Sequence, residues 1–141
     1  MYKRQVLLGI TAGVLSSLGS ILALAWLFGL EHKYYVSLLP KSITTAIGLG
    51  VSEELGGMTT VTVAVIIITG VLGNILAESI CKIFRIHEPI AVGLALGTSS
   101  HAIGTSKALE LGEIEGAMSS LSIAVAGLLT VVLASVFSTF M

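Results

Sequence analysis

The sequence predicts an all-α, polytopic integral membrane protein. Of its 141 residues, 55% are hydrophobic and 11% are charged, whereas soluble domains carry about 25% charged residues. Four runs of the chain contain no charged residue, and three of them exceed the roughly 20 residues that a membrane-spanning helix needs. These runs are residues 5–30, 55–77, 89–106 and 116–141.

Intact membrane helices are predicted at residues 6–30, 58–80 and 117–141. The first contains Gly9-xxx-Gly13, a spacing of small residues that lets membrane helices approach closely. Trp26 lies near the end of this helix, where aromatic side chains favour the membrane interface.

Two segments of mixed character lie between these helices. Residues 34–52 contain Pro40, which interrupts a helix, followed by the polar stretch Lys41–Thr45. Residues 89–109 begin apolar and then carry Gly, Ser and Thr around His101. Unsatisfied backbone and hydroxyl groups are costly in hydrocarbon, so a lipid-facing helix would not have this composition. We therefore expect two broken or re-entrant polar segments that face one cavity.

An internal repeat relates these pieces. Shifting the sequence by 60 residues, without a gap, places Lys41 on His101. Each unit is then a broken segment followed by an intact helix, a construction that recurs in secondary transporters, whose substrates bind where the broken helices meet. The sequence thus predicts a tandem repeat of about 60 residues, supported by the matched pairs Thr45 and Thr105, Glu53 and Glu113, and Gly56 and Gly116.

Loop charge suggests an orientation. Lys82 and Arg85 follow a long helix and indicate a cytoplasmic loop, and the C-terminus would then be cytoplasmic as well. The basic residues at the start of the chain, Lys3 and Arg4, fit this orientation if residues 34–52 are re-entrant and fit it poorly if they cross the membrane.

The two polar segments supply the candidate binding residues. Lys41 needs an anion at membrane depth, and a substrate carboxylate meets that need; the alternative is a lysine that snorkels to the interface. His101 can donate to a carboxylate and exchanges a proton near neutral pH, or it can serve packing through a hydrogen bond to a neighbouring helix. The Ser, Thr and Gly residues can donate to an anion or simply permit close helix contact. The candidate substrate-binding residues are Lys41, Ser42, Thr44, Thr45, Gly97, Thr98, Ser99, Ser100, His101, Gly104 and Thr105.

Other patterns favour structural roles. We expect Lys107 to pair with Glu110, three residues further along a helix. The Ser100–His101 pair is adjacent in sequence, which is poor geometry for a nucleophile and its base, and the chain has no Asp to orient the imidazole. The single Cys81 excludes an internal disulfide. We expect no catalytic group, metal site or cofactor, and the net charge of −1 gives no reason to expect nucleic acid.

The polar motifs resemble those of the LrgB/CidB family of bacterial membrane proteins. The resemblance rests on LPKSITTAIGLGVSEELGG (residues 39–57) and HEPIAVGLALGTSSHAIGTSKALELGEIEGAMSSL (residues 87–121), and it extends over about residues 6–137. Ala46 stands where relatives often have Pro, which leaves Pro40 as the expected break. Family members have a longer N-terminal portion, so residues 1–141 are expected to form a single LrgB-like membrane domain that lacks it.

The resemblance implies one of two functions. The first is transport of small monocarboxylates of the pyruvate, glycolate and glycerate type across the bacterial plasma membrane, together with a small LrgA/CidA-like membrane protein. The alternative is an antiholin-like regulator of murein hydrolase activity and cell lysis, which acts through its oligomeric state. Either function implies a multi-pass membrane protein and a homo-oligomer.

Overall fold

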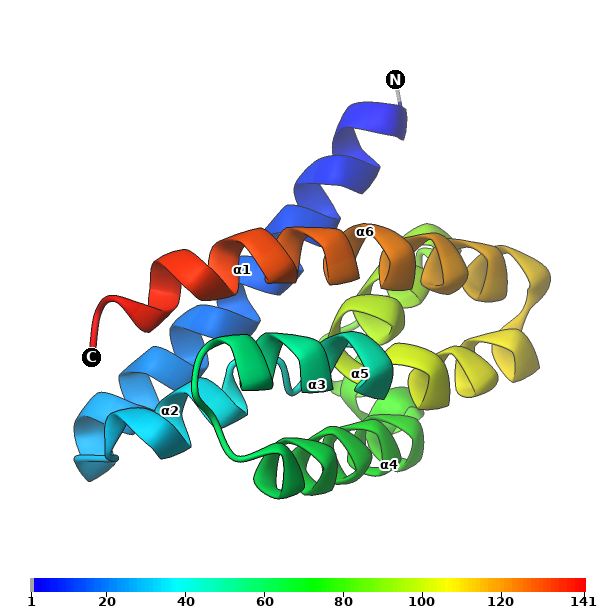
Figure 1. Ribbon diagram of the computed structural model, residues 1–141. Helices are drawn as coiled ribbons and strands as arrows, with labels where there is room; N and C mark the ends of the chain where they lie inside the picture. The colour runs from blue at the N-terminus through cyan, green and yellow to red at the C-terminus, as the bar shows by residue number, and fades with distance from the viewer. Residues whose placement is uncertain (1) are drawn as a thin grey trace.

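The computed structural model describes residues 2–141 and is built from helices throughout this range. The all-α membrane architecture expected from the sequence is confirmed. In chain order the helices are α1 (Tyr2–Phe28), α2 (His32–Leu38), α3 (Thr45–Glu54), α4 (Thr59–Ile83), α5 (Pro89–Leu111) and α6 (Glu113–Ser138) (Figure 1).

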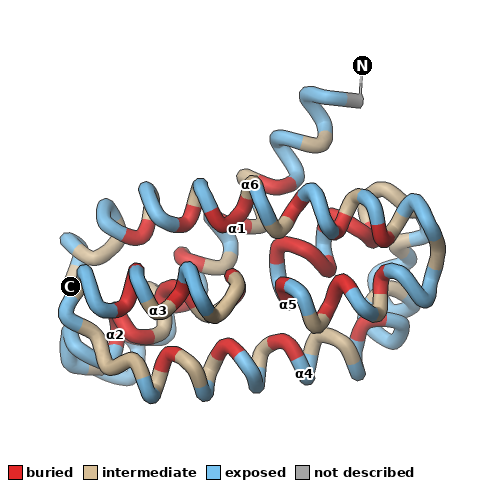
Figure 2. Tube along the Cα trace, turned by 45° about the vertical axis from the view of Figure 1, so that its right-hand side comes forward, coloured by how far each residue is buried: buried red, intermediate tan, exposed pale blue. Residues whose placement is uncertain are grey.

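Helices α1, α4 and α6 are the long ones. Among the described residues, they are the three helices long and apolar enough to cross a membrane. Each buries one side against the other helices and leaves the opposite side exposed (Figure 2). Because the exposed side carries large apolar residues such as Leu8, Ile75 and Leu128, it suits contact with lipid rather than water.

Helices α2 and α3 form a hairpin around the break expected at Pro40. Pro40 lies beside Gly48, and Ser37 and Ser52 both form hydrogen bonds with Thr62 of α4. Earlier residues of α2 therefore face later residues of α3, so the two helices are antiparallel. Thr62 Oγ1 lies 2.9 Å from the Ser37 carbonyl oxygen and 2.7 Å from Ser52 Oγ, which holds both arms of the hairpin on α4.

Helix α5 is the second broken segment, and its break lies at His101, where φ is 42° and ψ is −138°. The first half of α5 runs antiparallel to α4: Ser100 lies against Gly73, and Leu96 packs in one apolar cluster with Ala77. The half formed by residues 89–100 is about 18 Å long, roughly half of a hydrocarbon core of about 30 Å. It therefore ends near the middle of the membrane.

The second half of α5 turns back along α4. Ile103 accepts a hydrogen bond from Asn74 at 2.9 Å, and Lys107 pairs with Glu78 at 2.8 Å. Both ends of α5 then lie on the same side, because a small pocket is lined from both ends of the helix. That pocket is bounded by Glu78, Cys81, Lys82, Ile86, His87, Val92, Leu111 and Glu115.

The two hairpins approach from opposite sides of the protein. The α2–α3 hairpin starts and finishes at the N-terminal end of α4, whereas α5 starts and finishes at its C-terminal end. The breaks fall at Lys41 and His101, as the shift of 60 residues places them. The repeat units are therefore inverted with respect to each other, an arrangement found in several transporter folds.

The C-terminus lies on the side opposite the loop at residues 84–88, which corrects the orientation expected from the sequence. The hydroxyl of Tyr35 donates to the Phe137 carbonyl at 2.8 Å, which places the end of α6 beside α2. Figure 1 shows the C-terminus next to α2 and away from the α5–α6 turn. The expectation that the C-terminus lies on the same side as the 84–88 loop was wrong because α5 turns back at His101 instead of crossing.

The start of α1 lies on the same side as the 84–88 loop, since Gln5 and Glu88 line one cavity. Five cations, Lys3, Arg4, Lys82, Arg85 and Lys107, therefore lie on this side, and Lys33 lies on the other. From this asymmetry we predict that the 84–88 side faces the cytoplasm.

Cysteine labelling tests this topology. In a Cys81→Ser background, we expect a membrane-impermeant maleimide to label Phe140→Cys from outside intact cells and to leave Phe84→Cys unlabelled until the cells are broken. Both positions are open to reagent, with exposed fractions of 59% and 71%. Labelling of Phe84→Cys in intact cells, or protection of both positions, would contradict the topology.

Candidate functional site

A cavity of about 870 Å³ lies beside the two breaks. It lies between four parts of the protein: α1, the tip of the α2–α3 hairpin, Ile80 of α4, and the first half of α5 with the loop before it. Its described lining is Gln5, Val6, Gly9, Gly13, Ser16, Ser17, Ser20, Lys41, Ser42, Ile80, Glu88, Ile90, Ala91, Leu94, Ala95, Thr98 and Ser99.

A chain of hydrogen bonds crosses the cavity wall at the first break. The ammonium of Lys41 donates to Ser42 Oγ at 2.9 Å, and Ser42 Oγ lies 2.9 Å from Ser17 Oγ of α1. Ser42 is buried and Lys41 is half-buried. The lysine head group is thus held by the Ser42 hydroxyl and is not paired with a carboxylate in any described ion pair.

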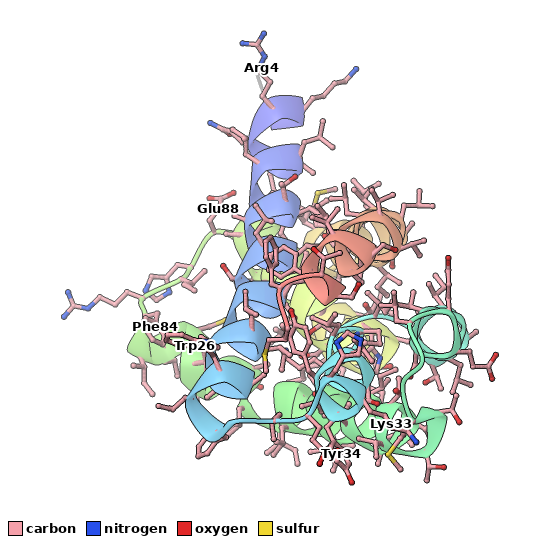
Figure 3. All side chains as sticks on the ribbon, turned by 60° about the vertical axis from the view of Figure 1, so that its left-hand side comes forward. Arg4, Trp26, Lys33, Tyr34, Phe84 and Glu88 are labelled. Atoms are coloured by element: carbon pink, nitrogen blue, oxygen red, sulfur yellow. The ribbon has the colours of Figure 1, made fainter. Side chains whose placement is uncertain are left out.

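Two charged residues of opposite sign line the cavity. Lys41 is the one cation among its described lining residues, and Glu88 is the one carboxylate. Glu88 is exposed in the loop before α5 and lies beside the N-terminal half of α1 (Figure 3). Lys41 instead belongs to a hairpin tip inside the protein. The interior of the cavity therefore presents positive charge and hydroxyl groups.

The α5 side of the cavity is formed just before the break. Thr98 is buried and its hydroxyl donates to the Leu94 carbonyl at 2.8 Å. Helix α1 passes close by, because a Cβ on Gly13 would lie 2.6 Å from Thr98 Oγ1. Ser99 is exposed toward the cavity, and its Oγ lies 3.0 Å from Ser100 Oγ.

The structure brings four of the eleven candidate residues to this cavity: Lys41, Ser42, Thr98 and Ser99. The expectation that both polar segments face one cavity is therefore met at these positions and not at the others. The remaining seven lie in the hairpin tips or against neighbouring helices and are absent from the described lining. They are Thr44, Thr45, Gly97, Ser100, His101, Gly104 and Thr105.

These seven residues shape the hairpins. Thr44 precedes the first turn of α3, which begins at Thr45. Gly97 lies directly against the backbone of Ser119 in α6. Thr105 binds across to the same residue, with its Oγ1 at 2.7 Å from Ser119 Oγ and at 3.0 Å from the His101 carbonyl oxygen.

His101 is directed at α4 rather than into the cavity. Its Nε2 lies 2.9 Å from the Ile66 carbonyl oxygen. A carbonyl can only accept, so Nε2 carries the hydrogen and donates it. The positive φ of 42° is a conformation that residues other than glycine rarely adopt, and it costs on the order of 1–3 kcal/mol. The surrounding contacts hold this strained residue at the turn of α5.

Sequence reasoning missed the α4 residues that accommodate this turn. A Cβ on Gly70 would lie 2.7 Å from the Cε1 atom of His101, and a Cβ on Gly73 would clash with Ser100 Oγ. Asn74 adds the hydrogen bond to Ile103. A polar Asn in an otherwise apolar membrane helix was the signal available in the sequence, since such residues face protein rather than lipid.

Lys107 closes the base of the second hairpin. It pairs with Glu110 at 3.2 Å, which confirms the expected pair, and with Glu78 of α4 at 2.8 Å. The second contact was not foreseen, because it joins residues that are adjacent only once α5 turns back.

Comparisons with known proteins agree with this architecture. The family model described as "LrgB-like family" matches residues 1–140. Proteins named "Antiholin-like protein LrgB" from Bacillus mycoides (strain KBAB4) and from Bacillus cereus (strains B4264 and AH187) are each 39% identical over 139 residues. The match covers 99% of this chain and 60% of each relative, so the chain spans about 60% of their length. No solved structure matches the chain.

The contact between α4 and the tip of α5 can be tested by adding single methyl groups. We expect Gly70→Ala and Gly73→Ala each to lower the free energy of unfolding in detergent by about 1–3 kcal/mol, because the new Cβ displaces His101 or Ser100. Gly19→Ala is the matched control, since a Cβ there has no neighbour within 4 Å. The close approach would be refuted if all three variants unfolded at the temperature of the unmodified protein.

Proposed function

The chain belongs to the LrgB-like family, and from this premise we propose that it forms the substrate-binding part of a carrier for small monocarboxylates. The substrates are of the pyruvate, glycolate and glycerate type, and the carrier lies in the plasma membrane of a bacterium. It acts as a transport protein and not as an enzyme. A small LrgA/CidA-like membrane protein and further copies of the chain are its proposed partners.

The observation that carries this proposal is the position of Lys41. Lys41 lines a cavity of about 870 Å³, and its ammonium is held by the Ser42 hydroxyl, without a paired carboxylate among the described residues. A carboxylate entering a site of low dielectric must exchange its water for fixed donors, or the desolvation cost prevents binding. A lysine supplies both charge and hydrogen bonds, and charge-assisted hydrogen bonds are about twice as strong as neutral ones.

The size of the cavity and the hydroxyls that line it suit a small anion. Small-molecule sites commonly enclose about 300–1,000 Å³, so this cavity has room for a two- or three-carbon acid together with water. The hydroxyls of Ser42 and Ser99 can bind the substituent oxygens of such an acid. Only one cation lines the described cavity, which favours a substrate with a single carboxylate.

The inverted hairpins also support a transport function. Broken helices that meet near the middle of the membrane bind the substrate in many secondary transporters, and inverted repeats let two halves of one protein serve the two sides of the membrane. Here both hairpin tips reach the cavity, through Lys41 and Ser42 from one repeat and Thr98 and Ser99 from the other.

A second candidate function is regulation of murein hydrolase activity and cell lysis. The printed name of the relatives, antiholin-like protein, favours it. A regulator that acts through oligomerisation would need its lipid-facing surfaces, but it would not need a lysine inside a cavity. The consequence of removing the Lys41 charge therefore separates the two candidates.

Uptake into proteoliposomes tests the transport proposal. With the chain reconstituted in the presence and absence of an LrgA-like protein, we expect saturable uptake of labelled pyruvate or glycolate. Lys41→Met should lower kcat/KM by roughly ten- to a hundredfold, which corresponds to losing a hydrogen bond to a charged group. Lys33→Met is the control, because Lys33 is exposed on α2. Absence of uptake in both reconstitutions, or a fully active Lys41→Met, would contradict the proposal.

His101 contributes by fixing the turn that presents Thr98 and Ser99. We expect His101→Ala to lower uptake by far more than it lowers the amount of folded protein in the membrane, because the strained turn loses its hydrogen bond to Ile66. Glu115→Ala, in the first turn of α6, should be nearly silent. Quantitative uptake across pH 5–8, normalised to folded protein, measures the effect. Wild-type rates at every pH for His101→Ala would reduce the histidine to a packing residue.

A further inference from the structure

Helix α1 lies outside the repeated units, yet one of its hydroxyls reaches the charged end of the cavity. Ser17 Oγ lies 2.9 Å from Ser42 Oγ, and Ser42 in turn accepts from Lys41. Neighbouring hydroxyls of α1 bond within their own helix: Thr11 donates to the Leu7 carbonyl and Ser20 to the Ser17 carbonyl, both at 2.8 Å. Among the described hydrogen bonds, Ser17 is thus the α1 side chain that bonds to a hairpin tip.

The hydrogens in this cluster can be counted. A lysine ammonium has three N–H donors and no acceptor, and one donor is used on Ser42. The hydroxyls of Ser17 and Ser42 have two hydrogens, of which one lies between the two oxygens. Whichever hydroxyl donates in that bond, the other keeps its hydrogen. Two N–H groups and one O–H therefore remain outside this chain of hydrogen bonds, beside one another on the cavity wall.

We propose that Ser17 is a positioning residue for Lys41, so that α1 completes the carboxylate site through the Ser17–Ser42–Lys41 chain. The inference rests on the proposed function and adds to it a third wall from outside the repeat. The Ser17 hydroxyl fixes Ser42, and Ser42 fixes the ammonium at the end of a flexible side chain. Without Ser17, the lysine samples more rotamers and the remaining donors no longer converge on one carboxylate.

Two variants separate positioning from packing. Ser17→Ala should raise the KM for pyruvate roughly three- to tenfold, the effect of one lost hydrogen bond between two neutral hydroxyls, with a smaller change in kcat and an unchanged amount of folded protein. Ser17→Thr keeps the hydroxyl and should restore the KM. Thr11→Ala is the control on the same helix, because Thr11 is absent from the described cavity lining. A wild-type KM for Ser17→Ala would overturn the proposal.

A chemical readout tests the same contact without relying on transport. In a Cys81→Ser background, Ser17→Cys should react with an anionic methanethiosulfonate faster, relative to a cationic one, than it does when Lys41 is also changed to Met. A unit charge a few ångströms away changes this rate ratio on the order of tenfold. Pyruvate should slow the anionic reaction.

These outcomes distinguish the two proposals. If Lys41→Met does not change the rate ratio at Ser17→Cys, then Ser17 does not lie beside the charge, and the positioning role is lost even if transport depends on Lys41. If the rate ratio depends on Lys41 while Lys41→Met transports normally, the contact is real and the carboxylate-carrier function is the part that fails.

Discussion

A broken helix inside a membrane must satisfy its backbone and side-chain polar groups without help from water. This requirement governs most of the contacts described above. The α2–α3 hairpin is held on α4 by Thr62, which binds both of its arms. In α5, Thr105 accounts for the carbonyl at the break and Asn74 for a carbonyl beyond it. Four polar residues at or beside the two tips, Lys41, Ser42, Thr98 and Ser99, line the cavity, so the breaks also bring polar groups to the candidate binding site.

The two hairpin tips are related by the repeat, but their central residues make different contacts. Lys41 and His101 occupy equivalent positions 60 residues apart. Lys41 lines the cavity and donates a hydrogen bond to Ser42. His101 instead bonds to the backbone of α4 and holds a strained turn. The intact helices explain the difference. Gly70 and Gly73 of α4 give His101 and Ser100 room against the helix, but the equivalent positions of α6 are Thr130 and Leu133.

Much of the architecture could be predicted from the sequence. Polar groups are costly to bury in lipid, so apolar runs mark the membrane helices and polar interruptions mark segments that pack inside the protein. The long helices, the Pro40 break and the duplication followed from this. The path of α5 did not, because a segment that crosses and one that turns back have the same composition. The direction of α5 depends on a positive φ at His101. Because this residue is not a glycine, the sequence carries no signal for that backbone conformation. For the site, Lys41 and Ser99, which the sequence predicts as substrate-binding residues, line the cavity. Ser17 was missed because a small hydroxyl residue in α1 suits close packing equally well.

The central claim is that the cavity binds a carboxylate through the charge of Lys41. Isothermal titration of the purified protein in detergent with pyruvate and with pyruvamide tests it most directly, since the two molecules are similar in size and differ in charge. Saturable binding of pyruvate, its loss in Lys41→Met, and no measurable binding of pyruvamide are the expected results. Equal affinity for pyruvate and pyruvamide, or pyruvate binding that survives Lys41→Met unchanged, would contradict the account.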